Sequence, residues 1–262
     1  MISSAITFHP IPALKDNYIW AMVHTEKRSA MIVDPGEAAP VIDFLKQQQL
    51  ALAAILITHH HWDHTSGVLE LKKLYDVPVF GSAQEKVTGL TTHLNEHDEI
   101  IVPFFPTLTT IAIPGHTLGH IALHAKELNC LFSGDTLFAA GCGRLFEGTP
   151  AQMYASLQKL ALLPDHTHIY CGHEYTLQNL QFAAHVEPNN KKIVERIAQV
   201  EALRQRGQPS LPTLLKEEKA TNPFLRCAFL EVTVSVEKQV GKKLHDAVDV
   251  FAALREWKNG YK

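Results

Sequence analysis

Histidines are crowded into one short segment of the chain, 58-THHHWDHTSG-67. The apolar run before it, residues 53–58, predicts a strand that leads directly into this segment. If the extended form continues, the alternation of side chains along a strand places His59 and His61 on one side and His60 on the other. We therefore expect His59 and His61 to bind one metal ion, and we expect His60 not to be a ligand.

The same segment must turn shortly afterwards. Residues 65–67, Thr-Ser-Gly, precede a helical pattern of apolar residues and read as a helix start. The chain must therefore turn near Asp63 and His64, and this turn directs both side chains toward a second ion beside the first.

Three further candidate ligands each follow an apolar run and a glycine: His116, Asp135 and His173. Glycine permits a tight turn that exposes the next side chain, and open α/β sheets bind ligands beyond the carboxyl ends of their strands. We expect these residues to join the histidine segment at one edge of a sheet.

Together these residues predict a centre with two divalent metal ions. The first ion is assigned to His59, His61 and His116, the second to Asp63, His64 and His173, and a bridge between the ions to Asp135. Nitrogen and carboxylate donors without thiolate favour zinc, although iron or manganese would accept the same set. Each ion keeps an open position, which is typical of a catalytic site, and a water shared by the two ions would form the attacking hydroxide. In this scheme Asp63 and Asp135 orient the hydroxide.

Composition is that of an ordinary globular protein. The chain has 262 residues, of which 46% are hydrophobic and 19% charged. The four cysteines show no Cys-x-x-Cys spacing, so we expect reduced thiols rather than a disulfide framework. No apolar run is long enough to cross a bilayer and the start of the chain does not resemble a secretory signal, so we expect a cytoplasmic protein with no membrane partner.

Charge is distributed unevenly along the chain. Residues 1–187 contain 10 Lys and Arg against 18 Asp and Glu, a net charge of −8, whereas residues 188–262 contain 14 against 9, a net charge of +5. The acidic part contains the candidate metal ligands. It therefore lacks the basic surface that a nucleic-acid enzyme needs, and we expect no nucleic-acid partner.

The pattern of apolar residues divides the chain into two parts. Residues 1–174 alternate short β-rich runs with helical ones, which predicts an α/β domain carrying the metal centre. Residues 175–262 show mainly helical periodicity, for example in 189–206 and 246–258, and predict a smaller α-helical C-terminal domain.

The ordered motifs THHHWDH, GHTLGH, FSGD and CGHEY resemble those of the metallo-β-lactamase superfamily. The segments 14-LKDNY-18, 141-GCGRLFEGT-149 and 171-CGHEYT-176, with 185-HVEP-188 and 222-NPF-224, resemble glyoxalase II, the hydroxyacylglutathione hydrolase family, in its bacterial form. The resemblance extends over essentially the full length. It implies an αββα sandwich with a dinuclear site at one edge, followed by a helical substrate-binding domain.

The resemblance also implies an activity and a set of substrate contacts. The family hydrolyses S-D-lactoylglutathione to D-lactate and glutathione, the second step of methylglyoxal disposal, so the expected partner is a small glutathione thioester. We expect the chain to act as a monomer. The substrate contacts carried over are Arg144, Phe146, Tyr175, Arg255 and Lys258. Some members have a lysine where this chain has Arg144 and a tyrosine where it has Phe146, so a cation is kept and a hydroxyl contact is lost.

Four alternatives remain. A β-lactamase of this superfamily is normally exported, and the chain shows no signal segment. A nuclease of this fold would need a basic surface near the site. A mononuclear iron persulfide dioxygenase would lack most of the helical part. A non-enzymatic metal-dependent binding protein is the alternative from another class, and the open metal positions favour an enzyme over it.

Overall fold

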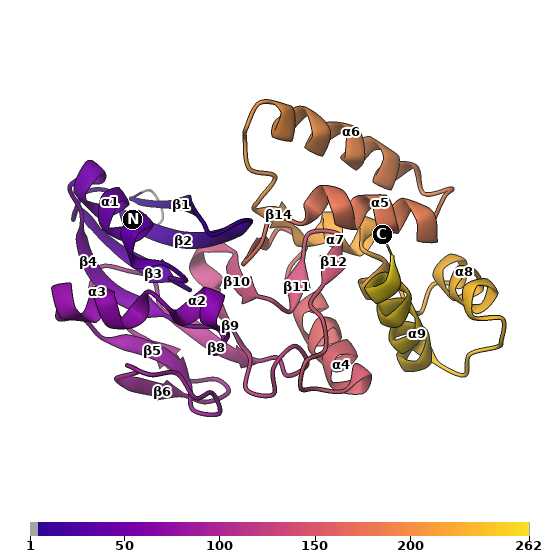
Figure 1. Cartoon of the computed structure of the whole chain (residues 1–262), viewed down its shortest axis with the longest axis horizontal. Coiled ribbons are helices and arrows are strands. Elements are labelled where there is room, and N and C mark those ends of the chain that lie inside the picture. The colour runs from indigo at the N-terminus through magenta and orange to yellow at the C-terminus, as the bar shows by residue number, and fades with distance from the viewer. Residues whose placement is uncertain (1–4, 262) are drawn as a thin grey trace.

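The computed structural model describes residues 5–261 and shows two six-stranded sheets packed face to face, with helices on both outer faces (Figure 1). The expected α/β class and αββα sandwich are confirmed. Helices that follow the sandwich in sequence cover one end of it, and they occupy the orange and yellow part of Figure 1.

The first sheet has the strand order β1-β2-β3-β4-β5-β6. Its strands are β1 (Ile6–Ala13), β2 (Asn17–His24), β3 (Ser29–Val33), β4 (Ala51–Leu56), β5 (Val79–Ser82) and β6 (Thr92–Leu94). The first three strands pair antiparallel, and β3 to β6 pair in parallel. β4 is the strand expected before the histidine segment, and it is buried on both faces along its second half.

The second sheet has the strand order β14-β13-β10-β9-β8-β7. Its strands are β7 (Glu99–Ile100), β8 (Leu108–Ala112), β9 (Ile121–Ala125), β10 (Cys130–Gly134), β13 (His168–Cys171) and β14 (Thr213–Leu214). A hairpin of β11 (Leu137–Phe138) and β12 (Gly141–Cys142) stands beside this sheet. β14 was not expected, because the sequence predicts only helices after residue 174.

Three apolar layers hold the sandwich together. Met22, Met31 and Phe132 belong to the layer between the sheets. The outer face of the first sheet packs against α1 (Ala38–Gln48) and α3 (Val68–Leu74). The outer face of the second sheet packs against α4 (Pro150–Ala161), whose first turn is fixed by a capping box between Thr149 and Gln152.

Four of the five described α-helices after residue 174 share the outer apolar layer of the second sheet, and the helix at residues 191–205 packs in a separate apolar cluster. The five helices are α5 (Thr176–Val186), α6 (Lys191–Gln205), α7 (Leu215–Thr221), α8 (Leu230–Val240) and α9 (Ala247–Gly260). Phe182 of α5 and Phe251 of α9 belong to the same buried cluster as Leu131 and Ile169 of the sheet. The helical part is therefore not a separate globule. The division at residue 174 falls between β13 and α5 and stays a prediction.

All four cysteines are free and buried, in agreement with the expected thiols. Within residues 5–261, no helix combines the length and the apolar composition needed to cross a membrane.

A buried ion pair joins α6 to α7 and both helices to the β11–β12 hairpin. Arg196 contacts the Glu218 carboxylate at 2.5 Å, and both side chains are almost completely buried. The other oxygen of Glu218 accepts a hydrogen bond from the Ala140 amide at 2.7 Å. This pair therefore fixes the hairpin that forms one wall of the site described below.

Breaking this pair from one side should destabilise the protein strongly. Arg196→Leu leaves the Glu218 carboxylate buried without its cation, which should lower the free energy of unfolding by about 3–5 kcal/mol in urea titrations. The control Lys219→Met removes the exposed partner of Asp165 and should cost no more than about 1 kcal/mol. Equal losses in the two variants would show that the buried pair does not stabilise the fold.

Candidate metal centre

The seven side chains expected to bind metal lie around one point at the edge of the sandwich. They follow the carboxyl ends of strands from both sheets. His59 and His61 follow β4, Asp63 and His64 lie in α2 (Trp62–Thr65), His116 follows β8, Asp135 follows β10 and His173 follows β13. The structure thus brings these residues together, and their binding of metal stays a prediction.

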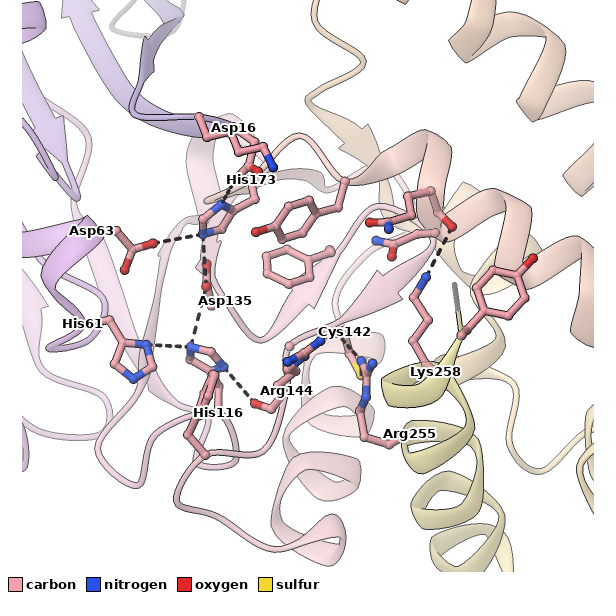
Figure 2. A pocket seen from close by; sticks show the side chains of 18 of the residues that line it. Asp16, His61, Asp63, His116, Asp135, Cys142, Arg144, His173, Arg255 and Lys258 are labelled. Atoms are coloured by element: carbon pink, nitrogen blue, oxygen red, sulfur yellow. Dashed lines mark hydrogen bonds and ion pairs between the residues drawn. The ribbon is translucent and has the colours of Figure 1, made fainter. Parts of the chain in front are cut away.

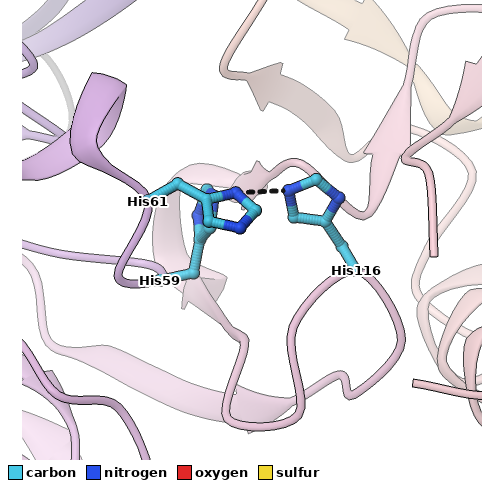
Figure 3. A group of neighbouring side chains, drawn as sticks. All are labelled: His59, His61 and His116. Atoms are coloured by element: carbon cyan, nitrogen blue, oxygen red, sulfur yellow. Dashed lines mark hydrogen bonds between the residues drawn. The ribbon is translucent and has the colours of Figure 1, made fainter. Parts of the chain in front are cut away.

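His59, His61 and His116 form the first group (Figure 3). The Nδ1 atom of His61 lies 3.2 Å from His59 Nε2 and 2.9 Å from His116 Nε2. His116 Nδ1 donates to the carbonyl of Arg144 at 2.8 Å. His59 Nδ1 lies 3.1 Å from the Thr58 hydroxyl, which already donates its proton to a carboxylate. Both Nε2 atoms therefore carry lone pairs, and the single proton of His61 satisfies only one of them.

Asp63, His64 and His173 form the second group, and Asp135 lies between the two groups. One oxygen of Asp63 lies 3.4 Å from the Nε2 atoms of both His64 and His173. Asp135 Oδ1 lies 3.4 Å from His64 Nε2, and Asp135 Oδ2 lies 3.3 Å from His173 Nε2 and 3.6 Å from His116 Nε2. Asp135 therefore contacts both groups through its two oxygens.

Two further carboxylates fix the outer nitrogens of the second group. Asp34 lies 3.1 Å from His64 Nδ1, and Asp16 lies 2.8 Å from His173 Nδ1. Each Nδ1–H donates to its carboxylate, so the Nε2 atom of each ring is the one that faces Asp63 and Asp135. A carboxylate that holds the far side of a histidine is a common feature of metal sites.

The donor set fits divalent metal ions. Four-coordinate ions with bonds of about 2.0–2.1 Å separate neighbouring ligand atoms by about 3.3 Å, close to the spacings within the groups. Among the described residues, the buried atoms His64 Nε2 and Asp135 Oδ1 have no hydrogen-bond partner. Buried lone pairs that face one another are costly unless a cation lies between them. Asp34 forms a further group of possible ligands with His59 and His64. Its two oxygens already accept hydrogen bonds from Thr58 and His64, so we do not assign it to a metal ion.

Electrostatics differ between the two groups. Burial lowers the pKa of His173, but the carboxylates of Asp135 and Asp63 outweigh it and raise that pKa to about 10. Burial holds the pKa of His59 well below its usual range and also lowers the pKa of His116. Burial would raise the pKa of Asp135, yet His173 and His64 hold it well below its usual range. The carboxylates of the second group therefore favour positive charge beside them, which a proton on His173 supplies in the metal-free protein, while the first group offers neutral imidazoles.

Further residues position the ligands, and two of them, Asn17 and Asp34, were not predicted from the sequence. Asn17 donates to the Asp63 carboxylate at 3.1 Å. His120 stacks on His59 and accepts from the Asp135 amide at 3.0 Å. Asp34 holds both the amide and the hydroxyl of Thr58. The sequence feature that could have identified Asn17 and Asp34 is their position at the ends of strands, next to turns.

His60 points away from the ligand groups, as the alternation along the strand predicted. Its ring contacts the buried carboxylate of Glu85 and, at 3.2 Å, that of Glu147. Glu85 also accepts from Thr117 at 2.5 Å. These contacts connect the segment bearing His59 and His61 to the loop bearing His116.

A glycine allows the last ligand loop to approach the centre. A β-carbon at Gly172 would lie 2.6 Å from Asp135 Oδ1 and 2.7 Å from His64 Cε1. No other residue fits here without displacing these two side chains.

A cavity of about 700 Å³ extends from the metal-ligand groups to helix α9 (Figure 2). The five residues expected to contact substrate all line it: Arg144, Phe146, Tyr175, Arg255 and Lys258. Their binding of substrate stays a prediction.

Two of these residues differ strongly in how far they are buried. Arg255 is almost completely buried. It donates to the carbonyl of Cys142 at 2.8 Å, and its Nε atom has no partner among the described residues. Phe146 is 64% exposed, and its ring lies 5.4 Å from that of His61 and 5.3 Å from that of His116.

The other three expected substrate contacts are Tyr175, Lys258 and Arg144. Tyr175 stacks on His173 with ring centroids 4.7 Å apart. Lys258 Nζ donates to the carbonyl of Gln178 at 3.3 Å and lies over the ring of Phe182. Arg144 is exposed on the loop after β12.

Comparison with known proteins gives two family matches and close relatives. The family model described as metallo-beta-lactamase superfamily matches residues 15–173, and the model described as hydroxyacylglutathione hydrolase C-terminus matches residues 174–261. A hydroxyacylglutathione hydrolase from Nitrosomonas europaea is 49% identical, over 98% of this chain and 97% of that protein. One from Alkalilimnicola ehrlichii is 55% identical, over 95% of this chain and 97% of that protein.

Solved structures with the same fold are more distant in sequence. The crystal structure of ETHE1 from Myxococcus xanthus has a TM-score of 0.66 at 23% identity and covers 96% of this chain and 98% of its own. That of the BLEG-1 B3 metallo-beta-lactamase has a TM-score of 0.64 at 25% identity and covers 84% of this chain and 99% of its own.

The contact between Asp34 and His64 should contribute to metal affinity. Asp34→Asn keeps the shape but removes the negative charge that orients the imidazole, so zinc affinity in chelator competition should fall about 10- to 100-fold. Asp98→Asn, which changes a carboxylate that accepts from the Asn95 amide away from the centre, is the matched control. The same zinc affinity in both variants would contradict this role.

Proposed function

The chain belongs to the hydroxyacylglutathione hydrolase family of the metallo-β-lactamase superfamily, and we propose that it hydrolyses S-D-lactoylglutathione to D-lactate and glutathione. The observation that carries this proposal is the single cavity that joins the metal-ligand groups to the cations of α9, in a chain about half identical to hydrolases of this name. Action as a monomer stays a prediction. A cytoplasmic location stays a prediction.

Two divalent ions are proposed to be held by the seven residues of the metal centre. The first would be bound by His59, His61 and His116, the second by Asp63, His64 and His173, and both by Asp135. Donors of nitrogen and carboxylate oxygen favour zinc over softer metals, and iron or manganese also fit such a set. When bound, such ions lower the pKa of water and polarise a carbonyl group.

The protein's own carboxylates orient the reactants. Asp63 lines the cavity, and Asn17 fixes the oxygen of Asp63 that faces His64 and His173. Asp135 is ionised, and its Oδ2 atom lies between His116 of the first group and His173 of the second, while its Oδ1 atom faces His64. Each carboxylate accepts a hydrogen bond from an attacking water and so directs the water's lone pair toward the thioester carbon. The glutathione thiol has an ordinary pKa of about 8.5, so its thiolate leaves without a separate general acid.

The far end of the cavity is suited to the anionic glutathione moiety. Arg255 and Lys258 lie one helical turn apart on α9 and both face the cavity in Figure 2. The guanidinium group of Arg255 and the ammonium group of Lys258 can donate to carboxylates. Arg144 supplies a third cation, and Tyr175 supplies an aromatic wall beside His173.

The metal-loaded protein should release free thiol from S-D-lactoylglutathione. In a thiol-reagent assay, Asp135→Ala should lower kcat by more than the roughly 10- to 100-fold typical for loss of an outer hydrogen-bond partner, because it removes contacts to both groups. An intact thioester with fully loaded native protein, together with cleavage of a lactam or a phosphodiester, would contradict the proposed substrate.

Lys258 should give the reaction a pH dependence. Burial and the neighbouring Arg255 lower the pKa of Lys258 to about 8, so the ammonium is charged below this pH and neutral above it. The attraction for glutathione carboxylates should disappear as the pH rises, and kcat/KM should fall above about pH 8.

The variant Lys258→Arg provides the test, because arginine keeps its charge throughout this range. It should remove the fall in kcat/KM, and an uncharged thioester of a short thiol should show no such fall with the native enzyme. Persistence of the same alkaline fall in Lys258→Arg would assign it to another group.

A further inference from the structure

The two groups of metal ligands are held from outside in different ways. In the second group, carboxylates hold the outer nitrogens of His64 and His173. In the first group, the outer nitrogens of His59 and His116 contact a hydroxyl and a carbonyl instead. The geometry of the first group therefore depends more strongly on the backbone segments that carry its rings.

The segments of the first group come from different sheets. His61 follows β4 of the first sheet and His116 follows β8 of the second, yet their facing nitrogens lie 2.9 Å apart (Figure 3). A metal ion between them needs a fixed separation, because ligand distances vary by only about 0.2 Å around the ideal value. A contact that joins the two segments therefore bears directly on the site of the first ion.

Glu85 joins these segments from a third one, the turn after β5. Its Oε2 atom accepts from the His60 amide at 3.2 Å and also contacts the His60 ring. Its Oε1 atom accepts from the Thr117 hydroxyl at 2.5 Å. His60 immediately precedes His61, and Thr117 immediately follows His116, so one carboxylate holds a neighbour of each ligand.

The surroundings of Glu85 are enclosed and closely packed. Its side chain is only 2% exposed, and Thr117 is completely buried. The loop after His116 approaches so closely that a β-carbon at Gly119 would lie 2.9 Å from Glu85 Cγ. The carboxylate therefore has little freedom to move.

Glu147 makes a second connection between the same segments, nearer the surface. One of its oxygens lies 3.2 Å from His60 Nε2, and the other accepts from the Leu118 amide at 2.9 Å. The Glu147 side chain is 34% exposed, so water competes for its contacts. Glu85 is therefore the stronger of the two links.

We propose that Glu85 is a positioning residue for the first metal ion. By holding the residues next to His61 and His116, it sets the separation of these two rings. Rings that are already in place lose less conformational freedom when the ion binds, which raises affinity. This inference rests on the metal centre of the proposed function, and it adds a residue outside the ligand set and outside the described lining of the cavity.

The test measures zinc binding at each site separately. Chelator competition gives the two zinc dissociation constants in solution. Anomalous diffraction from crystals held in the same zinc buffer gives the occupancy of each peak, and so assigns each constant to its group of ligands. Zinc is the only probe, so the measurement does not depend on thioester hydrolysis.

Glu85→Gln keeps the shape of the side chain but replaces one acceptor with a donor, so His60 and Thr117 can no longer both donate to it. Zinc affinity at the first site should fall about tenfold, and affinity at the second site should stay at its native value. Thr117→Val breaks the same link from its other end and should also weaken the first site. Because both changes break one link, the double variant should bind zinc no more weakly than Glu85→Gln alone.

Glu187→Gln is the matched control. The Glu187 side chain is 3% exposed, and its carboxylate pairs with Arg226 at 2.9 Å away from the metal centre. The control should lower stability in urea titrations and leave both zinc affinities unchanged. It therefore separates loss of stability from loss of ligand positioning.

A native affinity at the first site of Glu85→Gln would overturn the positioning role, and so would an equal fall at both sites. A double variant whose loss is the sum of the single losses would also overturn it, because the two residues would then act independently. If Glu85→Gln does not fold, an unchanged first site in Thr117→Val would overturn the role. Native protein that binds two zinc ions but leaves S-D-lactoylglutathione intact would instead contradict the proposed function, and the zinc affinities of the variants would still decide the role of Glu85.

Discussion

The structure depends on one electrostatic constraint, the convergence of buried lone pairs and carboxylates on a single point. His59 and His116 present ring nitrogens without enough protons to satisfy them, and Asp63 and Asp135 add negative charge. Such an arrangement is unfavourable in a protein interior unless cations occupy it. Burial keeps His59 in the neutral form that binds metal, whereas the raised pKa of His173 means that a metal ion must displace a proton from that ring.

The fold makes this convergence possible by bringing strand ends from two sheets to one edge. The same edge receives Asp16 and Asp34, which hold the outer nitrogens of His173 and His64. The helices after residue 174 do not stand apart, because most of them share an apolar layer with the second sheet. The Arg196–Glu218 pair connects α6 and α7 to the hairpin beside the cavity, and Arg255 of α9 donates to the carbonyl of Cys142 in the same hairpin.

Local sequence patterns predicted the parts of the site that depend on local geometry. Alternation along a strand predicted that His59 and His61 would share a side, and an apolar run with a glycine located His116, Asp135 and His173. The partners of these ligands were not predictable in this way, because Asp16 lies 157 residues from His173 and Asp34 lies 30 residues from His64. β14 has only two residues, too few to show a pattern. Arg255 is buried beside Cys142, which lies 113 residues away in the sequence, so no local pattern predicts its burial. Helix α4 was also missed, although its capping box is visible in the sequence.

The proposed centre contains two metal ions in contact with these seven side chains. Anomalous diffraction from crystals of the zinc-loaded protein tests this most directly. We expect two zinc peaks in each chain, about 3.5–4 Å apart, with Asp135 contacting both. A single peak, or peaks bound away from His59, His116 and His173, would contradict the account.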